Sequence, residues 1–486
     1  MPSSVIAVPG RPGFAALLWW FQGPDDQPGN YQFELNGQPI PGQPWRLDGL
    51  LAGFPGGLSA EGLKLARRTF LLVTRHTPGT DATQNLRVLW RGEASNLASA
   101  RLLPRTADGL ELLLASCYYS ANSRLLPKAV TPRGRLAGRP PHAKLLCGDQ
   151  IYLDLSLGGF LPTRKPTPWE RYHDQWHDDA FLAWMANGGS LCLADDHEFW
   201  NNYPSTTRVT PWLAWLFQAP PATVAAQMRE AFTLYQAVLN ADPDALAGQA
   251  NPVLVIDDLH RFEFPGAAAG FAQTLSLLVL DTRIARDAPE LRAPNFAPPS
   301  WLNWVTARLA ARNGPTLLLT TQPLLDRGGG AEANLADYPA QFSELWDAVW
   351  NSRHQVMLLT GDIHWSRTQV VFNRQTGLEH YEVVSSALAR IHFANPLHNF
   401  SKLRSEVSWK AGKVVAQRLG DSDSPCTYAT LELRQGSAGL QCLVRWWEIN
   451  GDGQHVPMLM NAGIGEDLKR WLGMARAVTE HTFILR

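Results

Sequence analysis

The amino-acid sequence predicts an α/β protein preceded by a β-rich segment, and three observations support this class. Between residues 110 and 364, short apolar runs end abruptly in polar residues, as in "AKLLCGD" and "QVMLLTGDIH". Continuous apolar runs of this kind are typical of strands buried on both faces of a sheet. Segments with helical apolar spacing lie between several of these runs, whereas residues 1–108 show the pattern of antiparallel strands.

The N-terminal segment is characterised by its turn residues. In residues 1–108, short aromatic and β-branched runs are separated by Gly, Pro and Asn. They are "GFAALLWWFQ", "NYQFELNG", "FLLVTRHT" and "NLRVLWRG". Short runs separated by turn residues in this way predict antiparallel strands and a small sandwich-like N-terminal domain.

The remaining residues, 109–486, are predicted to form one larger domain. Helices are expected where apolar residues recur every three to four positions, at 168–187, 222–240 and 299–313. An insertion around 205–255 separates two of the buried strands and is partly helical. Its role stays open between a cover over the strand ends and plain structural packing.

The composition excludes several classes of function. Of the 486 residues, 45% are hydrophobic, and the formal net charge is −1, so no basic surface for nucleic acid is predicted. The five cysteines form no Cys-x-x-Cys pair, which argues against a disulfide framework or a zinc ribbon. No apolar run reaches the ~18–20 residues of a membrane span, and no signal peptide is evident. We therefore expect a cytoplasmic protein, with export by another route left open, and no obligatory protein partner is indicated.

Chemically reactive residues gather at the ends of the apolar runs. Ligands of open α/β sheets bind beyond the carboxyl ends of the strands, so residues at these ends share one rim if the strands are parallel. The residues concerned are Cys117, Asp149, Asp195, Asp196, His197, Asp281, Arg283, Gln322, Asp362 and His364. Adjacent carboxylates repel each other unless a cation lies between them. Oxygen ligands with imidazole suit divalent or trivalent metals, and two ions about 3.5–4 Å apart can clamp a phosphoryl group.

Each piece also has a simpler explanation when it is taken alone. Asp149 in "GDQIY" fits a helix cap, and "DDHE" fits a capping cluster at a helix start. Cys117 fits ordinary apolar packing. Arg283 either forms a salt bridge that orients an acidic ligand or contacts a phosphate directly. The metal site is favoured because three acidic strand ends occur in one chain.

Five motifs, taken in order, resemble the PhoD-like alkaline phosphatase and phosphodiesterase family of the calcineurin-like metallophosphoesterases. They are "ASCYYS", "LLCGDQIYLD", "ADDHEFWNNY", "LVLDTRIAR" and "LLTGDIHWS". The resemblance covers residues 110–400, and it is the order of the motifs that makes it specific. It implies a four-layer α/β/β/α catalytic core behind the β-rich segment, and metal-dependent hydrolysis of phosphoesters.

The resemblance also implies a set of metal ligands. Asp149 would bridge two ions, while Tyr152 and Cys117 would ligate a trivalent iron. The remaining ligands would be Asp195 or Asp196, Asn201 or Asn202, Asp362 and His364. The first histidine of the wider superfamily's "GHxH" is replaced by Asp362 here, which favours calcium or another divalent cation as the partner of the iron.

The activity that this resemblance implies is hydrolysis by a metal-bound hydroxide, which forms because a metal lowers the pKa of bound water. His197 and Arg283 would offset charge on the phosphoryl oxygens, and Asp196 would be a ligand or support one. We expect a small phosphoester substrate. A phosphodiesterase or a phospholipase D-like lipid hydrolase is the alternative, and a catalytically inactive scaffold is a third possibility.

Overall fold

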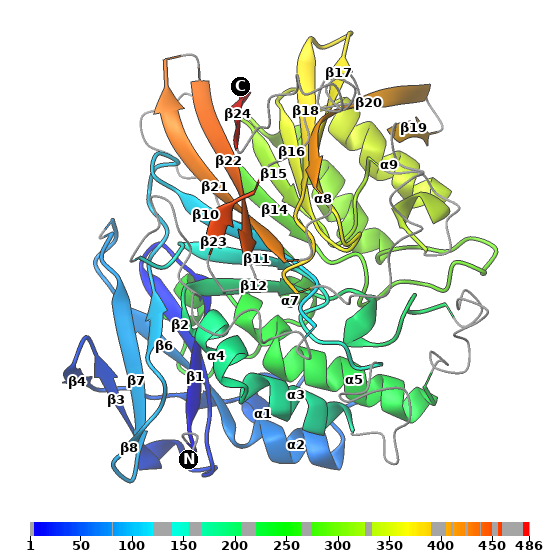
Figure 1. The fold of residues 1–486 in the computed structure, drawn as a ribbon. Coiled ribbons are helices and arrows are strands. Elements are labelled where there is room, and N and C mark those ends of the chain that lie inside the picture. Colours follow the sequence, from blue (N-terminus) through cyan, green and yellow to red (C-terminus); the bar gives the residue numbers. More distant parts are fainter. Residues whose placement is uncertain are drawn as a thin grey trace.

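The structure is a computed structural model, and it describes most of the chain. The described residues are 4–79, 81–119, 139–154, 167–205, 220–264, 275–325, 333–389, 405–409, 412–422, 426–437, 439–449, 455–458 and 480–485. Figure 1 shows two large sheets in its upper half and the N-terminal strands at its lower left. Within these residues, none of the helices has the length and apolar character needed to cross a membrane.

The N-terminal residues form two antiparallel sheets, as their turn pattern predicts. One sheet has the order β1-β2-β6-β5, and the other has the order β4-β3-β7-β8 with β9 beside β7. Their strands are β1 (Ile6–Pro12), β2 (Ala16–Gln22), β3 (Tyr31–Leu35), β4 (Gln38–Ile40), β5 (Trp45–Arg46), β6 (Thr69–Arg75), β7 (Gln84–Trp90), β8 (Glu93–Ala94) and β9 (Ala98–Ala100). Trp19, Phe33 and Val88 come from both sheets and belong to one buried cluster, so the two sheets pack face to face.

The other face of the first sheet packs against later parts of the chain. The indole N–H of Trp20 donates to the carbonyl of Leu234 at 2.9 Å, and its ring lies 5.7 Å from that of Tyr235. Nearby, the Glu230 carboxylate accepts the hydroxyl of Ser59 at 2.6 Å. The N-terminal strands therefore share a core with the rest of the protein, and the division at residue 108 stays a prediction.

One large sheet has seven strands in the order β12-β11-β10-β21-β22-β23, with β24 also paired to β22. The first three strands are parallel, and the others join antiparallel. Their bounds are β10 (Glu111–Ala115), β11 (Ala143–Cys147), β12 (Gly189–Leu193), β21 (Thr427–Gly436), β22 (Gly439–Ile449), β23 (His455–Pro457) and β24 (Glu480–Leu485). The parallel strands are the apolar runs that the sequence predicts to be buried on both faces.

The second large sheet has eight strands in the order β13-β14-β15-β16-β18-β17-β20-β19. Strands β14, β15, β16 and β18 are parallel. The bounds are β13 (Arg261–Phe264), β14 (Ser276–Leu280), β15 (Thr316–Leu319), β16 (Val356–Thr360), β17 (Ser366–Asn373), β18 (Leu378–Val384), β19 (Ser405–Trp409) and β20 (Gly412–Ser422). The expectation that these strands are mostly parallel is therefore confirmed, but they are divided between two sheets and do not form one rim of a single sheet.

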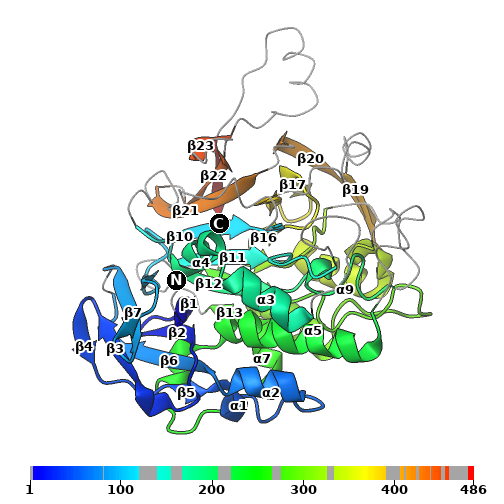
Figure 2. The ribbon, with the colours of Figure 1, turned by 60° about the horizontal axis from the view of Figure 1, so that its bottom comes forward.

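Successive side chains of these strands point to opposite faces, and each face meets a different partner. Leu145 of β11 and Leu317 of β15 belong to a cluster shared by the two large sheets. Leu146 and Leu318, one residue further along, belong to a second cluster that contains helical residues. The helices are α1 (Leu47–Leu50), α2 (Ala60–Ala66), α3 (Pro168–Trp176), α4 (Asp179–Ala186), α5 (Ala222–Tyr235), α6 (Pro243–Leu246), α7 (Asp257–His260), α8 (Pro299–Ala311) and α9 (Pro339–Trp350). Figure 2 shows α3 and α5 close to the N-terminal helices α1 and α2.

The described part of the predicted insertion is partly helical, and one face of α5 is buried. In α5, Phe232 and Leu234 are fully buried. Asn240, which follows α5, accepts the backbone N–H of Cys192 in β12 at 2.8 Å and donates to the carbonyl of the same residue at 2.8 Å. Residues 220–255 thus pack against the edge strand of the seven-stranded sheet, whereas residues 206–219 lie outside the described residues.

A fully buried ion pair joins β17 to β18. Arg367 and Glu382 are both 0% exposed, with 3.2 Å between Nη2 and Oε2. Glu382 also accepts the backbone N–H groups of Leu324 and Leu325 at 2.7 and 2.9 Å. The pair therefore fixes the segment that follows β15.

Arg367→Met is expected to lower the free energy of unfolding by about 3–5 kcal/mol, because it removes the Arg367 charge from beside the buried Glu382 carboxylate. Chemical denaturation of the purified variant measures this loss. Adding Glu382→Gln should recover most of it, since an amide oxygen still accepts from Leu324 and carries no charge. A single variant as stable as the wild type would contradict the prediction.

Candidate metal centre

Potential metal ligands from four of the parallel strands meet at one place. Among the residues that the structure describes, three groups have ligand atoms that all lie within 4.8 Å of one another: Cys117, Asp149 and His364; Asp149, Asp196 and His197; and Asp149, Asp195, Asp196 and Asp362. They follow β10, β11, β12 and β16, so both large sheets contribute. Asp149 belongs to all three groups and therefore lies at the centre of the cluster.

The backbone at this cluster is unusual. Five non-glycine residues in or beside it have a positive φ: Cys117 (60°), Asp149 (55°), Asn202 (63°), Asp362 (69°) and His364 (52°). This left-handed conformation is sparsely populated by residues with a Cβ atom, and it persists only where the surrounding structure enforces it. Such residues gather at functional sites, and four of these five, Cys117, Asp149, Asp362 and His364, carry the potential ligand atoms of the cluster.

Gly148 and Gly361 let the ligand-bearing loops approach closely. A Cβ atom on Gly148, whose φ is 84°, would lie 2.3 Å from the Cβ of Asp195 and 2.7 Å from its backbone nitrogen. A Cβ atom on Gly361 would lie 2.5 Å from the Cβ of Ser116. The glycine in each "GD" pair is therefore needed because another loop occupies the space of a side chain.

Gly148→Ala is expected to disrupt the site. Its methyl group collides with the backbone of Asp195, which cannot move without displacing the β12 loop. Gly109→Ala is the matched control, because Gly109 has a φ of 81° with nothing within 4 Å of the added Cβ. The control should cost only about 1–2 kcal/mol for the left-handed backbone. Thermal unfolding and metal content of both variants test this, and equal losses in the two would show that the collision is unimportant.

The carboxylates of the cluster carry more negative charge than buried groups tolerate. Burial raises the pKa of Asp149 and Asp195 well above the usual range, and neighbouring carboxylates raise it further. Burial also raises the pKa of Asp196, but the charges of His197 and Arg283 outweigh this, and the pKa is lowered. A cation between these side chains would relieve the repulsion.

An orphaned oxygen supports a cation at this place. Oδ1 of Asp195 accepts from the Nε of Arg283, but its buried Oδ2 has no hydrogen-bond partner. Buried carboxylate oxygens without a partner are costly, and a metal ion is a common explanation. The donor set of carboxylate, imidazole, thiol and phenol is also one that binds divalent and trivalent metals. The residues present therefore fit a metal centre.

A thiol, a phenol and an imidazole form one side of the cluster. Cys117 Sγ lies 3.5 Å from Asp149 Oδ2, and Tyr152 Oη lies 3.4 Å from the same oxygen and 3.1 Å from His364 Nε2. Burial raises the pKa of the Cys117 thiol and of the Tyr152 phenol, and nearby acidic groups add to this. Both groups are therefore neutral in the protein alone, and only a nearby cation would ionise them.

His197 also lies beside Asp149 and is held by Asp154, a residue that sequence reasoning missed. Its Nδ1 lies 2.8 Å from Oδ1 of Asp154, and its ring packs 4.2 Å from that of Tyr152. Burial lowers the pKa of His197, but the carboxylates of Asp154, Asp196 and Asp149 outweigh it, and the pKa is raised well above the usual value. Asp154 thus fixes the orientation of the imidazole and stabilises its charged form.

Arg283 and Gln322 are placed behind the cluster. Arg283 donates to Asp195 through Nε and to the carbonyl of Tyr203 at 2.8 Å, which favours the orienting alternative over direct contact with phosphate. Gln322 Nε2 donates to Asp362 Oδ2 at 2.8 Å. Asn202 donates its backbone N–H to Asp196 Oδ2 at 2.5 Å, and its side-chain oxygen accepts the N–H of Ala333.

Asp281 does not join the cluster, although it ends a parallel strand. Its Oδ1 accepts the backbone N–H groups of Arg283 and Ile284 at 2.8 and 2.9 Å, and its Oδ2 lies 3.3 Å from Nδ1 of His260. The expectation that all acidic strand ends point at one site is wrong here. The side chain turns back to cap its own loop, as a short acidic residue readily does, and its Oδ2 also accepts the backbone N–H of Ala194 at 3.3 Å.

Ser386 is a further neighbour of the cluster that sequence reasoning missed. Its Oγ donates to Cys117 Sγ at 3.2 Å and accepts the backbone N–H of His364 at 3.0 Å. A serine after an apolar strand gives no signal by itself. For Asp154, the position inside "GDQIYLD" was the available signal, because it follows Asp149 by five residues.

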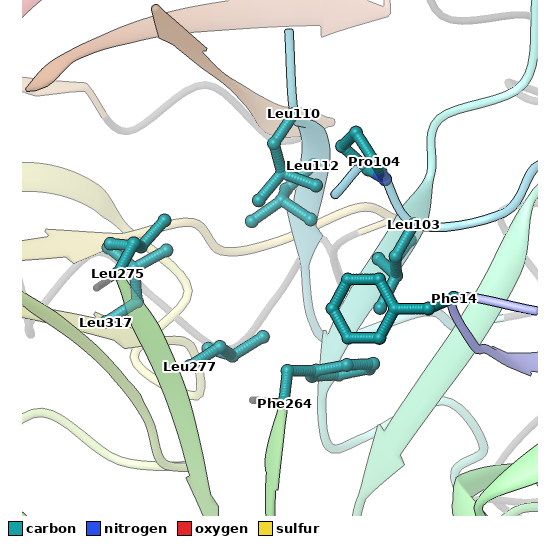
Figure 3. Close-up of a pocket in the computed structure, with 10 residues that line it drawn as sticks. Phe14, Leu103, Pro104, Leu110, Leu112, Phe264, Leu275, Leu277 and Leu317 are labelled. Carbon is teal, nitrogen blue, oxygen red and sulfur yellow. The ribbon is translucent and has the colours of Figure 1, made fainter. Parts of the chain in front are cut away.

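A separate apolar pocket lies at the other ends of the strands. Figure 3 shows Phe14 and Phe264 beside leucines of β10, β14 and β15. Its lining is Phe14, Leu103, Pro104, Leu110, Leu112, Ala143, Phe264, Leu275, Leu277 and Leu317. Because it includes early residues of the parallel strands and no titratable side chain, it plays no part in the cluster.

Comparison with known proteins agrees with this geometry at the level of the fold. No family model and no curated protein matches the chain. The chain is similar to a solved structure titled "Structure of PhoD", with a TM-score of 0.54 and 15% sequence identity over 94% of this chain and 93% of that one. At this identity the similarity concerns the fold alone. The resemblance predicted from the five motifs is thus confirmed in three dimensions, and the chain has a PhoD-like fold.

Proposed function

We propose that this protein is a metal-dependent phosphoester hydrolase, a PhoD-like phosphatase or phosphodiesterase that acts on a small phosphoester. The observation that carries the proposal is the convergence of buried ligand groups on Asp149, beside the unpartnered Oδ2 of Asp195. The PhoD-like fold supports it. The proposal includes the four-layer α/β/β/α core, which fits a cluster shared by the two large sheets and helical residues packed on their other faces.

The donor atoms suggest different ions on the two sides of Asp149. Cys117, Tyr152 and His364 suit a trivalent iron, because a thiolate and a phenolate match its charge. The carboxylates of Asp195, Asp196 and Asp362 suit calcium or another hard divalent cation. Bound ions would supply positive charge for the phosphoryl oxygens and a water molecule of lowered pKa.

The protein's own residues would position the substrate and control protons. His197, held at Nδ1 by Asp154, would present Nε2–H to a phosphoryl or leaving-group oxygen. Arg283 would keep Asp195 in place, and Gln322 would do the same for Asp362. This assigns Arg283 to positioning, through the contact that the structure shows.

Metal analysis followed by an activity assay tests the function. The purified protein, reconstituted with Fe³⁺ and Ca²⁺, is assayed with p-nitrophenyl phosphate and bis-p-nitrophenyl phosphate, and the ratio of rates separates a phosphatase from a phosphodiesterase. We expect hydrolysis that chelation abolishes and metal restores. Absence of metal uptake and of activity on both esters would overturn the proposal and favour an inactive scaffold.

A further inference from the structure

Glu198 connects the two loops that carry the acidic residues of the cluster. Its Oε2 accepts the backbone N–H of Asp149 at 2.7 Å and that of Asp195 at 2.8 Å. Its Oε1 accepts the backbone N–H of Gln150 at 2.6 Å. The side chain is fully buried, so no solvent competes for these bonds. One carboxylate thus binds the loop after β11 and the loop after β12 at the same time.

Ordinary helix capping explains only one of these bonds. Asp195 begins a short 3-10 helix, η3 (Asp196–Glu198), and the contact of Glu198 with the N–H of Asp195 is the usual return bond of a capping box. The bonds to Asp149 and Gln150 join residues 49 and 48 positions away in the chain. They contribute nothing to the cap, so they require another explanation.

The chemistry of the surroundings requires a carboxylate. Three backbone N–H groups point at Glu198, and the side-chain amide of Gln236 lies 3.5 Å from Oε1 as a further donor. All of these partners donate, and only a carboxylate offers two oxygens that accept. A glutamine would turn its NH₂ group toward at least one N–H and leave a buried donor without an acceptor, which is costly.

We propose that Glu198 is a positioning residue that sets the separation of Asp149 from Asp195 and Asp196 before any metal binds. The need for such positioning rests on the proposed function. The clamp, meaning the three bonds from the backbone N–H groups of Asp149, Gln150 and Asp195 to Glu198, is a property of the metal-free chain. Asp149 has a positive φ, and the bond from its N–H to Glu198 is one contact that holds this conformation. Other links between the loops, such as the N–H of His197 with Asp149 Oδ1 at 3.1 Å, would remain without Glu198.

The test compares Glu198→Gln with a matched control, Glu230→Gln. Glu230 is also buried and accepts a backbone N–H and a hydroxyl, both from Ser59, but it touches neither loop. Hydrogen–deuterium exchange followed by mass spectrometry is measured on the metal-free proteins. In Glu198→Gln, exchange should accelerate in residues 148–153 and 194–198. In the control it should accelerate only around Ser59.

Mn²⁺ titration by calorimetry supplies the second measurement. We expect the Kd for Mn²⁺ to rise about 10- to 100-fold in Glu198→Gln, as for other residues that orient ligands, and to stay unchanged in the control. If Glu198→Gln does not fold, Glu198→Asp keeps two acceptor oxygens on a shorter side chain that cannot reach both loops, and it should show the same pattern. Wild-type exchange in both loops, wild-type Mn²⁺ affinity, or an equal loss of affinity in the control would each overturn the clamp. If the wild type itself binds no metal, the proposed function fails, and the exchange data alone decide whether the clamp exists.

Discussion

Asp149→Asn is expected to abolish metal binding and phosphoester hydrolysis while the chain stays folded. Asp149 is common to all three groups of potential ligands, and an amide can neither offset the charge of two ions nor bridge them. The loss of activity should reach at least about a hundredfold, the upper end of what losing a supporting residue costs. Elemental analysis and the p-nitrophenyl assays measure the two effects on the same preparation.

The same variant should behave differently when metal is removed. The pKa of Asp149 is raised in the folded chain, so its burial is tolerated while it is protonated, and stability is lost as the pH rises from the unfolded pKa to the folded pKa. The metal-free wild type should therefore lose stability as the pH increases above about 4, the unfolded pKa of an aspartate. Asp149→Asn should flatten this dependence, because one of the repelling carboxylates is gone. Denaturation curves over a pH series measure it.

Asp281→Asn is the matched control for Asp149→Asn. Both aspartates are 1% exposed and follow parallel strands, but Asp281 binds backbone N–H groups instead of facing the cluster. The control should lower stability and leave metal content unchanged. Full metal content in Asp149→Asn, or equal loss of metal in both variants, would contradict a centre built on Asp149.

Asp154→Asn is expected to lower kcat about 10- to 100-fold, the effect of removing a group that orients a functional histidine. The carboxylate of Asp154 accepts from His197 at Nδ1 and fixes which nitrogen faces the cluster. An asparagine can turn its NH₂ group toward the ring and support the wrong tautomer. Steady-state kinetics of the variant give the kcat and KM values separately, and KM should change less than kcat.

The pH dependence of Asp154→Asn distinguishes this role from a structural one. Bound cations would neutralise Asp149 and Asp196, so Asp154 remains as the charge that keeps the pKa of His197 raised. Without it the pKa falls, His197 loses its proton at lower pH, and the alkaline limb of the rate profile moves toward lower pH. His197→Gln should remove that limb, and the double variant should be no slower than His197→Gln alone. Additive losses would show that the two residues act separately.

The secondary structure and part of the cluster could be predicted from sequence because they depend on local patterns. Continuous apolar runs predict buried parallel strands, and β10, β11, β12, β14, β15 and β16 are found where those runs lie. Parallel strands of one sheet end at one rim, so Asp149 and Asp195, which follow β11 and β12, could be expected near each other, whereas Asp362 follows β16 of the other sheet and joins them only through the packing of the two sheets. The need for glycine at positions 148 and 361, before Asp149 and Asp362, is tertiary, because Asp195 and Ser116 occupy the space of a side chain there.

The direction of each side chain beyond a strand end is not a local property. Asp149 and Asp281 follow equivalent strands, yet a positive φ turns the first into the cluster, and its own loop's N–H groups hold the second away. Asp154 follows Asp149 by five residues, but its contact with His197 depends on the fold of the loop after β11. The direction of these side chains depends on which backbone N–H groups of a loop lack a hydrogen-bond partner, and the spacing of residues in the sequence does not encode that.

The sequence by itself determined the class of the protein and the residue types available for chemistry. A strand that is buried on both faces requires a continuous apolar run, which is recognisable in the sequence. Acidic residues that end such runs are equally recognisable, because their charge requires compensation. Only the tertiary structure decided which carboxylates share a cation site, and that Glu198 links the loops that carry them. The physical reason is that these contacts join atoms far apart in the chain: Glu198 links the loops after the adjacent strands β11 and β12, and Asp362 reaches the cluster from the second sheet.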